Sequence, residues 1–174
     1  MKYLALILLS GFTYTSTAQE DTCKYLQKVE SIDSIITTLY AVISGEKKEE
    51  RNWELFRHLY KDGANMIPSG YARDSSYHVR YDTPDEYIES SGDWLIKNGF
   101  FENEIHREVQ QFGNIAHVFS TYHCFHSSKD KKPFMRGINS IQLVYDGQRW
   151  WIVNIFWAQE SEETPIPVEF LPKS

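Results

Sequence analysis

The spacing of hydrophobic residues changes near residue 100 of this 174-residue chain. Before that point they recur mainly every three or four positions, as at Leu26, Val29, Ile32 and Ile36. After it they alternate with polar residues, as in the segment 115–125. The first spacing is typical of amphipathic helices and the second of strands with one buried face. The pattern therefore predicts helices in the first half and a sheet in the second.

The hydrophobic pattern of the first half predicts three helices, with a short strand and a loop between the second and the third. The helices are expected at 25–43, 46–60 and 84–98, the strand at 64–72 and the loop at 73–82. Gly45 is expected to end the first helix. The third helix has the strongest start signal, because Thr83 can cap it, Pro84 suits its first turn and Glu86 completes a capping box.

The second half predicts four antiparallel strands joined in sequence: 100–112, 115–127, 134–145 and 148–160. Gly113-Asn114 and Asp146-Gly147 are expected to form the tight hairpin turns. Helices on one face of a mainly antiparallel sheet define an α+β domain, in which the sheet must curve around the helices.

The chain begins with a pattern typical of a secretory signal peptide. Lys2 precedes a short apolar run, and small residues stand at Ser16 and Ala18. We therefore expect cleavage near Ala18, a mature chain from Gln19, and a secreted or periplasmic protein with no membrane attachment. Polar residues before Cys23 argue against a lipoprotein. The predicted organisation is a signal peptide, a tail with the helix start, the α+β domain and a Pro-rich extended tail: 1–18, 19–30, 31–160 and 161–174.

Composition narrows the possible partners. The net charge is −6 and becomes −7 if Lys2 leaves with the signal peptide. An acidic protein without a basic stripe is a poor ligand for nucleic acid. Aromatic residues reach 15 %, which suits either a dense core or a lined pocket. Cys23 and Cys124 can form a disulfide in an oxidising compartment, and the sequence leaves that open.

The hairpin turns assign side chains to the two faces of the sheet. A turn at Gly113-Asn114 pairs Phe112 with Ile115, and counting back from it places Glu104 opposite His123. The same count puts one apolar face toward the helices: Phe101, Ile105, Arg107, Val109, Ala116, Val118, Ser120 and Tyr122. A turn at Asp146-Gly147 pairs Asn139 with Asn154.

The segment TYHCFH, residues 121–126, contains metal-ligand residue types in close succession. In a strand, His123 and Cys124 point to opposite faces, so the segment cannot bind one metal ion by itself. Glu104, His106 and His123 share a predicted face, but a solvated or dimer-facing cluster explains them better. We therefore predict no metal and no cofactor.

The order of elements resembles the NTF2-like superfamily and, more narrowly, its uncharacterised SnoaL-like bacterial members. The resemblance rests on FGNIAHVFSTY, RGINSIQLVYDGQRWWIV and the late PIP, and it covers residues 32–172. It implies a cone-shaped α+β fold with three N-terminal helices on a curved sheet. Relatives include cyclases, isomerases, dehydratases and non-catalytic modules, so the resemblance leaves the activity open.

Polar residues among apolar ones on the helix-facing side predict a conical small-molecule pocket. The predicted strand residues in it are Arg107, Tyr122, Asn139 and Asn154, and the helical half is expected to add Trp53, Tyr71, Tyr87 and Trp94. A structural role is equally open. Asn139 and Asn154 can pair with each other, and Arg107 can neutralise Glu86 or Asp93.

Three functions remain open at this stage. The first is a binding module for a small apolar or aromatic molecule. The second is a cofactor-free lyase or isomerase of the SnoaL or ketosteroid-isomerase type, which needs an inward acid or histidine that the predicted strand faces lack. The third is a homodimer through the outer sheet face, using Trp151, Trp157, Arg136 and Gln142, with Arg136 stacked on Trp157.

Overall fold

The computed structural model describes residues 24–71 and 76–173, with no account of the side chain of Tyr71. Its helices are α2 (Ile32–Ile43), α3 (Trp53–His58) and α4 (Pro84–Asn98), with short 3-10 turns η1 (Leu26–Lys28) and η2 (Val168–Phe170). Its strands are β1 (Tyr60–Tyr71), β2 (Tyr77–Val79), β3 (Phe101–Phe112), β4 (Ile115–Phe125), β5 (Met135–Tyr145) and β6 (Trp150–Gln159). The predicted α+β class is confirmed.

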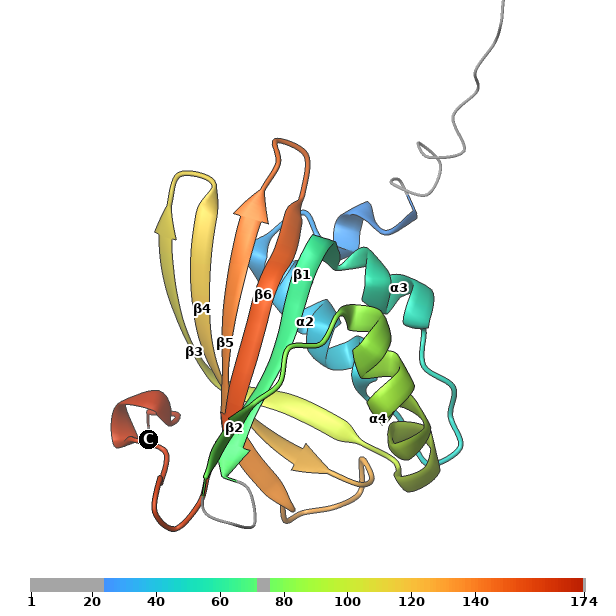
Figure 1. Cartoon of the computed structure of the whole chain (residues 1–174), viewed down its shortest axis with the longest axis vertical. Helices are drawn as coiled ribbons and strands as arrows, with labels where there is room; N and C mark the ends of the chain where they lie inside the picture. Colours follow the sequence, from blue (N-terminus) through green and yellow to red (C-terminus); the bar gives the residue numbers. More distant parts are fainter. Residues whose placement is uncertain (1–23, 72–75, 174) are drawn as a thin grey trace, which may run out of the picture.

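The six strands form one curved sheet in the order β2-β1-β6-β5-β4-β3. All neighbours are antiparallel except β1 and β6, which run parallel. Figure 1 shows the three helices together on one side of the sheet, which bends around them. The sheet therefore has an inner face toward the helices and an outer face away from them.

The first predicted helix begins later than its apolar stripe suggests. Residues 26–28 form only η1, and α2 starts at Ile32. Ser31 is the N-cap, because its hydroxyl accepts from the amide of Ser34 and the hydroxyl of Ser34 accepts in return from the amide of Ser31, both at 3.0 Å. The cap thus overrides the periodicity of the preceding residues.

The second predicted helix, 46–60, shrinks to α3. The cause is Arg51, which is only 6 % exposed and donates to the carbonyl oxygens of four residues: Ile43, Gly45, Glu49 and Leu95. The carbonyls of Gly45 and Glu49 lie in the loop after α2, that of Ile43 ends α2, and that of Leu95 belongs to α4. Wrapping around the guanidinium keeps residues 46–52 out of a regular helix. Asn52 then caps α3 through the amide of Leu55 at 2.9 Å.

The predicted strand 64–72 is longer in the structure, and part of the predicted loop is a strand. β1 starts at Tyr60 and pairs in parallel with β6, while β2 pairs with the far end of β1. The third predicted helix is confirmed as α4, including the capping box of Thr83 and Glu86. Gly99 ends α4 with φ of 72°, where a Cβ atom would collide with the carbonyl of His126.

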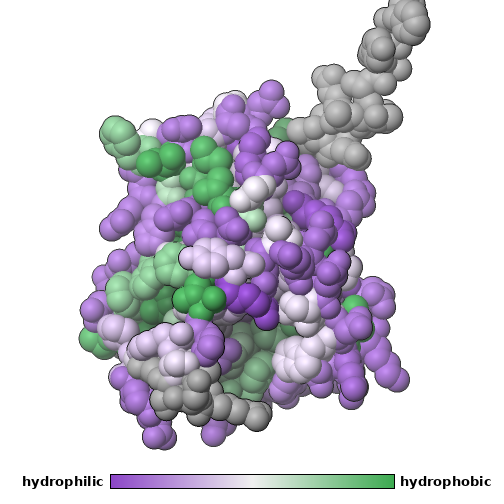
Figure 2. All heavy atoms as spheres, in the orientation of Figure 1, coloured by the Kyte–Doolittle hydropathy of each residue, from purple (hydrophilic) through white to green (hydrophobic). Residues whose placement is uncertain are grey.

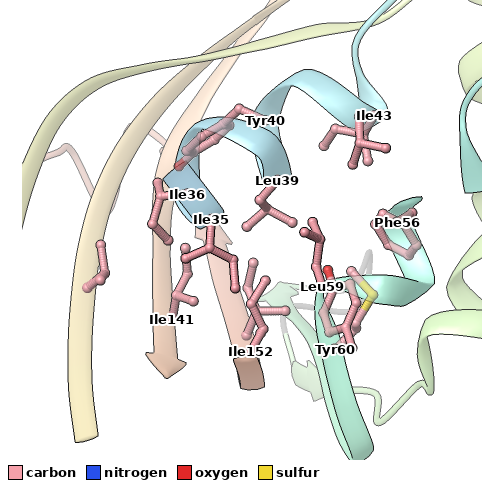
Figure 3. Packing of buried hydrophobic residues seen from close by; sticks show 14 of the residues in the cluster. Ile35, Ile36, Leu39, Tyr40, Ile43, Phe56, Leu59, Tyr60, Ile141 and Ile152 are labelled. Atoms are coloured by element: carbon pink, nitrogen blue, oxygen red, sulfur yellow. The ribbon is translucent and has the colours of Figure 1, made fainter. Parts of the chain in front are cut away.

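The core fills the space between α2, α3 and the inner face of the sheet. Figure 3 shows Ile35, Ile36 and Leu39 of α2 directed at Ile141 and Ile152 of the sheet. Each of these five side chains is at most 3 % exposed. Fully burying such a side chain contributes about 1.5–3 kcal/mol, so this layer holds the helices on the sheet.

A bulge in β3 changes the predicted faces. Phe112 pairs with Ile115 and His106 with Thr121 as predicted, but Glu104 then pairs with Tyr122 instead of His123. The extra residue is Ile105, and one extra residue reverses the faces beyond it. Phe101 therefore pairs with Phe125 on the outer face, and the assignment of Phe101 to the core was wrong.

The hairpin between β5 and β6 also differs from the prediction. Tyr145 pairs with Trp150 across a longer turn, and a second register shift separates Ile152 from Asn154. Asn154 consequently pairs with Gln142, and Asn139 pairs with Trp157. The predicted pair of Asn139 and Asn154 was therefore wrong.

The structure describes the C-terminal tail of the chain but not its first 23 residues. The predicted signal peptide, the cleavage site and Cys23 all lie outside the described residues. Residues 161–173 run along the outer side of the sheet (Figure 1), where Thr121 donates to the carbonyl of Phe170 at 2.7 Å. None of the described helices is both long and apolar enough to cross a membrane.

The surface is mixed in character. Figure 2 shows hydrophobic side chains gathered over the sheet, whereas the visible sides of the helices are mainly hydrophilic. Phe112, Ile115 and Phe156 are among the exposed hydrophobic residues of the strands, at 85 %, 55 % and 41 % exposure.

Candidate functional site

A cavity of about 220 Å³ lies between α2, α3, α4 and the inner face of the sheet. It has room for roughly seven waters at about 30 Å³ each, the size of a small ring compound. The lining is mostly apolar or aromatic, with six residues that carry polar groups: Tyr87, Ser91, Glu102, Tyr122, Asn139 and Gln159. Trp94 stands at the rim, where 46 % of it is exposed.

Glu102 places a carboxyl group in this apolar wall. The backbone amide of Glu102 donates to the hydroxyl of Ser44 at 3.0 Å, which ties the start of β3 to the end of α2. The amide of Asn139 donates to Glu102 Oε1 at 2.8 Å, and the thiol of Cys124 lies 3.9 Å from Oε2. Loss of hydration raises the pKa of Glu102 to about 7, against the opposing effect of the two donors, Asn139 and Cys124.

A hydrogen-bond chain leads from Asn139 to a second inward carboxylate. The amide of Asn139 donates to the hydroxyl of Tyr40 at 3.1 Å, and that hydroxyl lies 2.6 Å from the hydroxyl of Ser120. Ser120 donates in turn to Glu104. Arg107 binds both oxygens of Glu104, at 2.8 and 2.5 Å, so this carboxylate is neutralised, unlike that of Glu102.

Besides Tyr40, three tyrosines are electrostatically coupled to Glu102: Tyr60, Tyr87 and Tyr122. Tyr122 is 1 % exposed and its ring lies on Gly137 of β5, where a Cβ atom would collide with the ring and its hydroxyl. Tyr87 stacks on Phe56 with ring centroids 5.6 Å apart. The hydroxyl of Tyr60 is buried and has no partner among the described residues. Burial, followed by the nearby Glu102, raises the pKa of Tyr122, so its hydroxyl stays a neutral donor.

Comparison with known proteins places the fold. A scan of the sequence against protein-family models finds no match, and a search of curated proteins finds none. Among solved structures, an NTF-2 like protein of unknown function from Silicibacter pomeroyi DSS-3 is similar at a TM-score of 0.53 and 12 % identity, over 83 % of this chain and 100 % of that one. The chain has the NTF2-like fold.

Two further solved structures are similar to this chain. A putative scytalone dehydratase from Novosphingobium aromaticivorans DSM 12444 matches at a TM-score of 0.55 and 12 % identity, over 82 % of this chain and 89 % of that one. LinA matches at 0.56 and 6 % identity, over 86 % and 95 %. Identities this low show the fold and leave the activity to the site. Membership of the narrower SnoaL-like group stays a prediction.

Four of the eight predicted pocket residues line the cavity: Tyr122, Asn139, Tyr87 and Trp94. Their contact with a ligand stays a prediction. Asn139 does not pair with Asn154. Its amide is bound to Glu102 and Tyr40, so it forms part of the polar wall of the cavity.

Three of the other predicted pocket residues lie outside the cavity lining, and the structure does not describe the side chain of the fourth. Arg107 faces inward, but it is bound to Glu104 and, at 2.6 Å, to Asp33 of α2, so it neutralises neither Glu86 nor Asp93. Asn154 is turned to the outer face by the bulge in β6. Trp53 packs edge-on against Phe56 at 5.7 Å, outside the lining of the cavity. The side chain of Tyr71 is not among the described parts.

The bulges also revise the predicted outer face. Glu104 points inward to Arg107, so its predicted place opposite His123 on the outer face was wrong. Trp157 lines the cavity and meets Tyr87 edge-on at 6.3 Å. Arg136 is paired with Glu160 at 2.7 Å, so the predicted stacking on Trp157 was also wrong. The homodimer itself stays a prediction.

The strand prediction is confirmed for residues 121–125 of TYHCFH, and β4 ends at Phe125, one residue before His126. Cys124 is fully buried beside Glu102, while His123 packs on the ring of Phe125 at 4.6 Å. Within residues 24–71 and 76–173, no group of three or more His, Cys, Asp or Glu residues is arranged to hold a metal ion.

Glu102 is the functional residue that sequence reasoning missed. Simple alternation in FFENEIH assigns Glu102 and Glu104 outward because Phe101 and Ile105 alternate with them. One signal was available: Phe100 and Phe101 are adjacent and cannot both face the core of a strand. Phe100 takes the buried place at 5 % exposure, so Glu102 shares its face.

Proposed function

We propose that the protein is an isomerase or lyase that moves a proton on a small, mostly apolar molecule held in the cavity. Glu102 is the general base and acid in this proposal. The observation that carries it is a carboxyl group in an apolar cavity with a pKa of about 7. A group with that pKa is divided between its two forms at neutral pH, which suits proton transfer in both directions.

The surroundings of Glu102 support the same function. Aromatic and aliphatic walls favour an apolar substrate and limit the access of water to the carboxylate, which is partly buried. Asn139 fixes Oε1, and among the described residues Oε2 has only the long 3.9 Å contact with the Cys124 thiol, so Oε2 is the oxygen offered to the substrate. The hydroxyl of Tyr122 is available to donate to a substrate oxygen, and Trp94 at the rim offers a flat surface at the entrance.

Binding without chemistry is the simpler alternative. An apolar cavity of this size supports a binding module equally well, and the carboxyl of Glu102 is the feature that favours an enzyme. A polar, titrating group costs binding energy in an apolar wall unless it contacts the ligand. We further propose that the protein acts outside the cytoplasm, on the basis of the signal-peptide pattern in residues 1–18.

The test uses 2-tetralone, a small apolar ketone with acidic C–H bonds next to its carbonyl group. A general base removes one of these protons, and in D₂O the carbon receives a deuteron in return, so NMR follows the exchange. The proposal expects 2-tetralone to quench tryptophan fluorescence and to exchange faster with the protein than with buffer. Binding without accelerated exchange identifies a binding module, and absence of both contradicts the proposed substrate class.

A further inference from the structure

We propose that Tyr40 and Ser120 are positioning residues that hold Asn139 as a hydrogen-bond donor to Glu102. They do so because the hydrogen-bond chain that they form with Asn139 ends on Glu104, which can only accept. The proposal rests on the proposed role of Glu102 and adds how its charged form is maintained. Neither Tyr40 nor Ser120 lines the cavity. They act only through Asn139.

The direction of the chain follows from its two ends. Arg107 binds both oxygens of Glu104, and an ionised carboxylate only accepts hydrogen bonds, so the single proton of Ser120 points to Glu104. Ser120 must then accept from Tyr40, over 2.6 Å. The hydroxyl of Tyr40 has no second proton, so toward Asn139 it can only accept.

This direction decides how the amide group of Asn139 is turned. Only its nitrogen can donate to Tyr40, and the same nitrogen lies 2.8 Å from Glu102 Oε1. If the amide turned around, its oxygen would face both the lone pairs of Tyr40 and the carboxyl of Glu102. In the turned orientation, the amide oxygen of Asn139 would accept a hydrogen bond from protonated Glu102. The hydrogen-bond chain from Glu104 opposes this orientation and so disfavours the protonated form of Glu102.

Burial makes the chain effective. Tyr40, Ser120 and Asn139 are 6 %, 0 % and 4 % exposed, so water cannot replace a missing partner. Arg107 is itself fixed by Asp33 at 2.6 Å. The chain thus runs from a partly exposed ion pair on α2 and β3 to the wall of the cavity.

Other titratable groups around Glu102 do not carry a competing charge. Those that sense its charge come from α2, β1, α4 and β4: Tyr40, Tyr60, Tyr87, Tyr122 and Cys124. Burial raises the pKa of every one of them, so all are neutral at neutral pH. A change in the Glu102 titration on cutting the chain therefore reports the amide of Asn139.

The experiment measures the titration of Glu102 by ¹³C NMR on full-length protein labelled at its glutamate carboxyl groups, without any substrate. Glu102→Gln identifies the signal. Two variants cut the chain at different places, Ser120→Ala and Tyr40→Phe. Each frees the amide of Asn139 to turn when Glu102 is protonated. We expect the measured pKa of Glu102 to rise by about 1 in both, the effect of roughly one hydrogen bond.

Two matched variants separate position from packing. Ser120→Thr keeps the hydroxyl and should keep the wild-type titration. Ser140→Ala removes a similarly buried serine, 6 % exposed on the outer face and bound to His117 at 2.8 Å, and should leave Glu102 unchanged. The proposal is overturned if the pKa of Glu102 in Ser120→Ala and Tyr40→Phe equals or falls below the wild-type value. It is also overturned if Ser120→Thr raises this pKa as far as Ser120→Ala does.

The outcome is independent of catalysis. If the titration responds but 2-tetralone does not exchange, the positioning chain stands and the proposed function fails. If 2-tetralone exchange depends on Glu102 but the pKa of Glu102 is unchanged in both Ser120→Ala and Tyr40→Phe, the proposed function stands and the positioning role is refuted.

Discussion

The inner face of the sheet has two ends that use the same strands differently. At the packed end, Val118, Ile141 and Ile152 meet α2 with no exposed surface. At the hollow end, Tyr122, Asn139 and Glu102 face a cavity. Each of β4 and β5 contributes to both ends, so the difference comes from side chains a few positions apart. The packed end stabilises the helices, and that stability allows the hollow end to keep polar groups in an apolar wall.

The comparison predicts first that activity depends on the hollow end alone. Glu102→Gln should lower the exchange rate of 2-tetralone by about 10²–10⁴-fold, because a neutral amide cannot accept the proton. NMR in D₂O measures the rate. Glu108→Gln is the matched control, since Glu108 lies exposed on the same strand, and equal loss in both variants would show that Glu102 is not the base.

Stability should depend on the packed end. Ile152→Ala removes a fully buried side chain and should lower the free energy of unfolding by about 2–5 kcal/mol, as measured by denaturant titration. The fraction that stays folded should still bind 2-tetralone. Ile115→Ala removes the same atoms from a side chain that is 55 % exposed and should cost far less. Similar losses of unfolding free energy in Ile152→Ala and Ile115→Ala would contradict the claim that the packed end holds the stability of the fold.

The hollow end should make stability depend on pH. The pKa of Glu102 rises from 4.5 to about 7 on folding, so the folded state favours the protonated form. The resulting stabilisation is complete below about pH 4 and is lost as the pH rises through about 7. Relative to the wild type, Glu102→Gln should therefore gain roughly 3 kcal/mol of unfolding free energy from about pH 4 to about pH 8. A constant difference across this range would contradict the raised pKa of Glu102.

A smaller effect is expected for a single hydroxyl at the hollow end. Tyr122→Phe should weaken binding of 2-tetralone by about tenfold, the value of one hydrogen bond, while the melting temperature stays near that of the wild type. Fluorescence quenching and thermal unfolding measure the two quantities. Loss of melting temperature with unchanged affinity would assign the hydroxyl to the structure instead of the ligand.

The sequence predicted the packed end better than the hollow end. Alternation correctly placed Val118, Ile141 and Ile152 toward the helices, because these positions contact a continuous apolar layer. It also identified Tyr122 and Asn139 as polar residues on that face. The capping box of Thr83 fixed the start of α4 in the sequence because its signal is local.

What the sequence could not predict were single-residue insertions in the strands and long-range hydrogen bonds. The bulges at Ile105 and between Ile152 and Asn154 leave no mark on the alternating pattern, yet each reverses the faces beyond it. They turned Glu102 and Trp157 into the cavity and Asn154 out of it. Arg51 similarly shortened α3 through carbonyls distant in the chain, including that of Leu95.

The central claim is that Glu102 is a partly buried carboxyl that titrates near neutral pH at the wall of the cavity. The most direct test is the ¹³C NMR titration of Glu102 in the wild-type protein, with its signal assigned by Glu102→Gln and Glu108 serving as the exposed reference. We predict a pKa of about 7 for Glu102. A value close to the ordinary 4.5 of a glutamate would contradict the account.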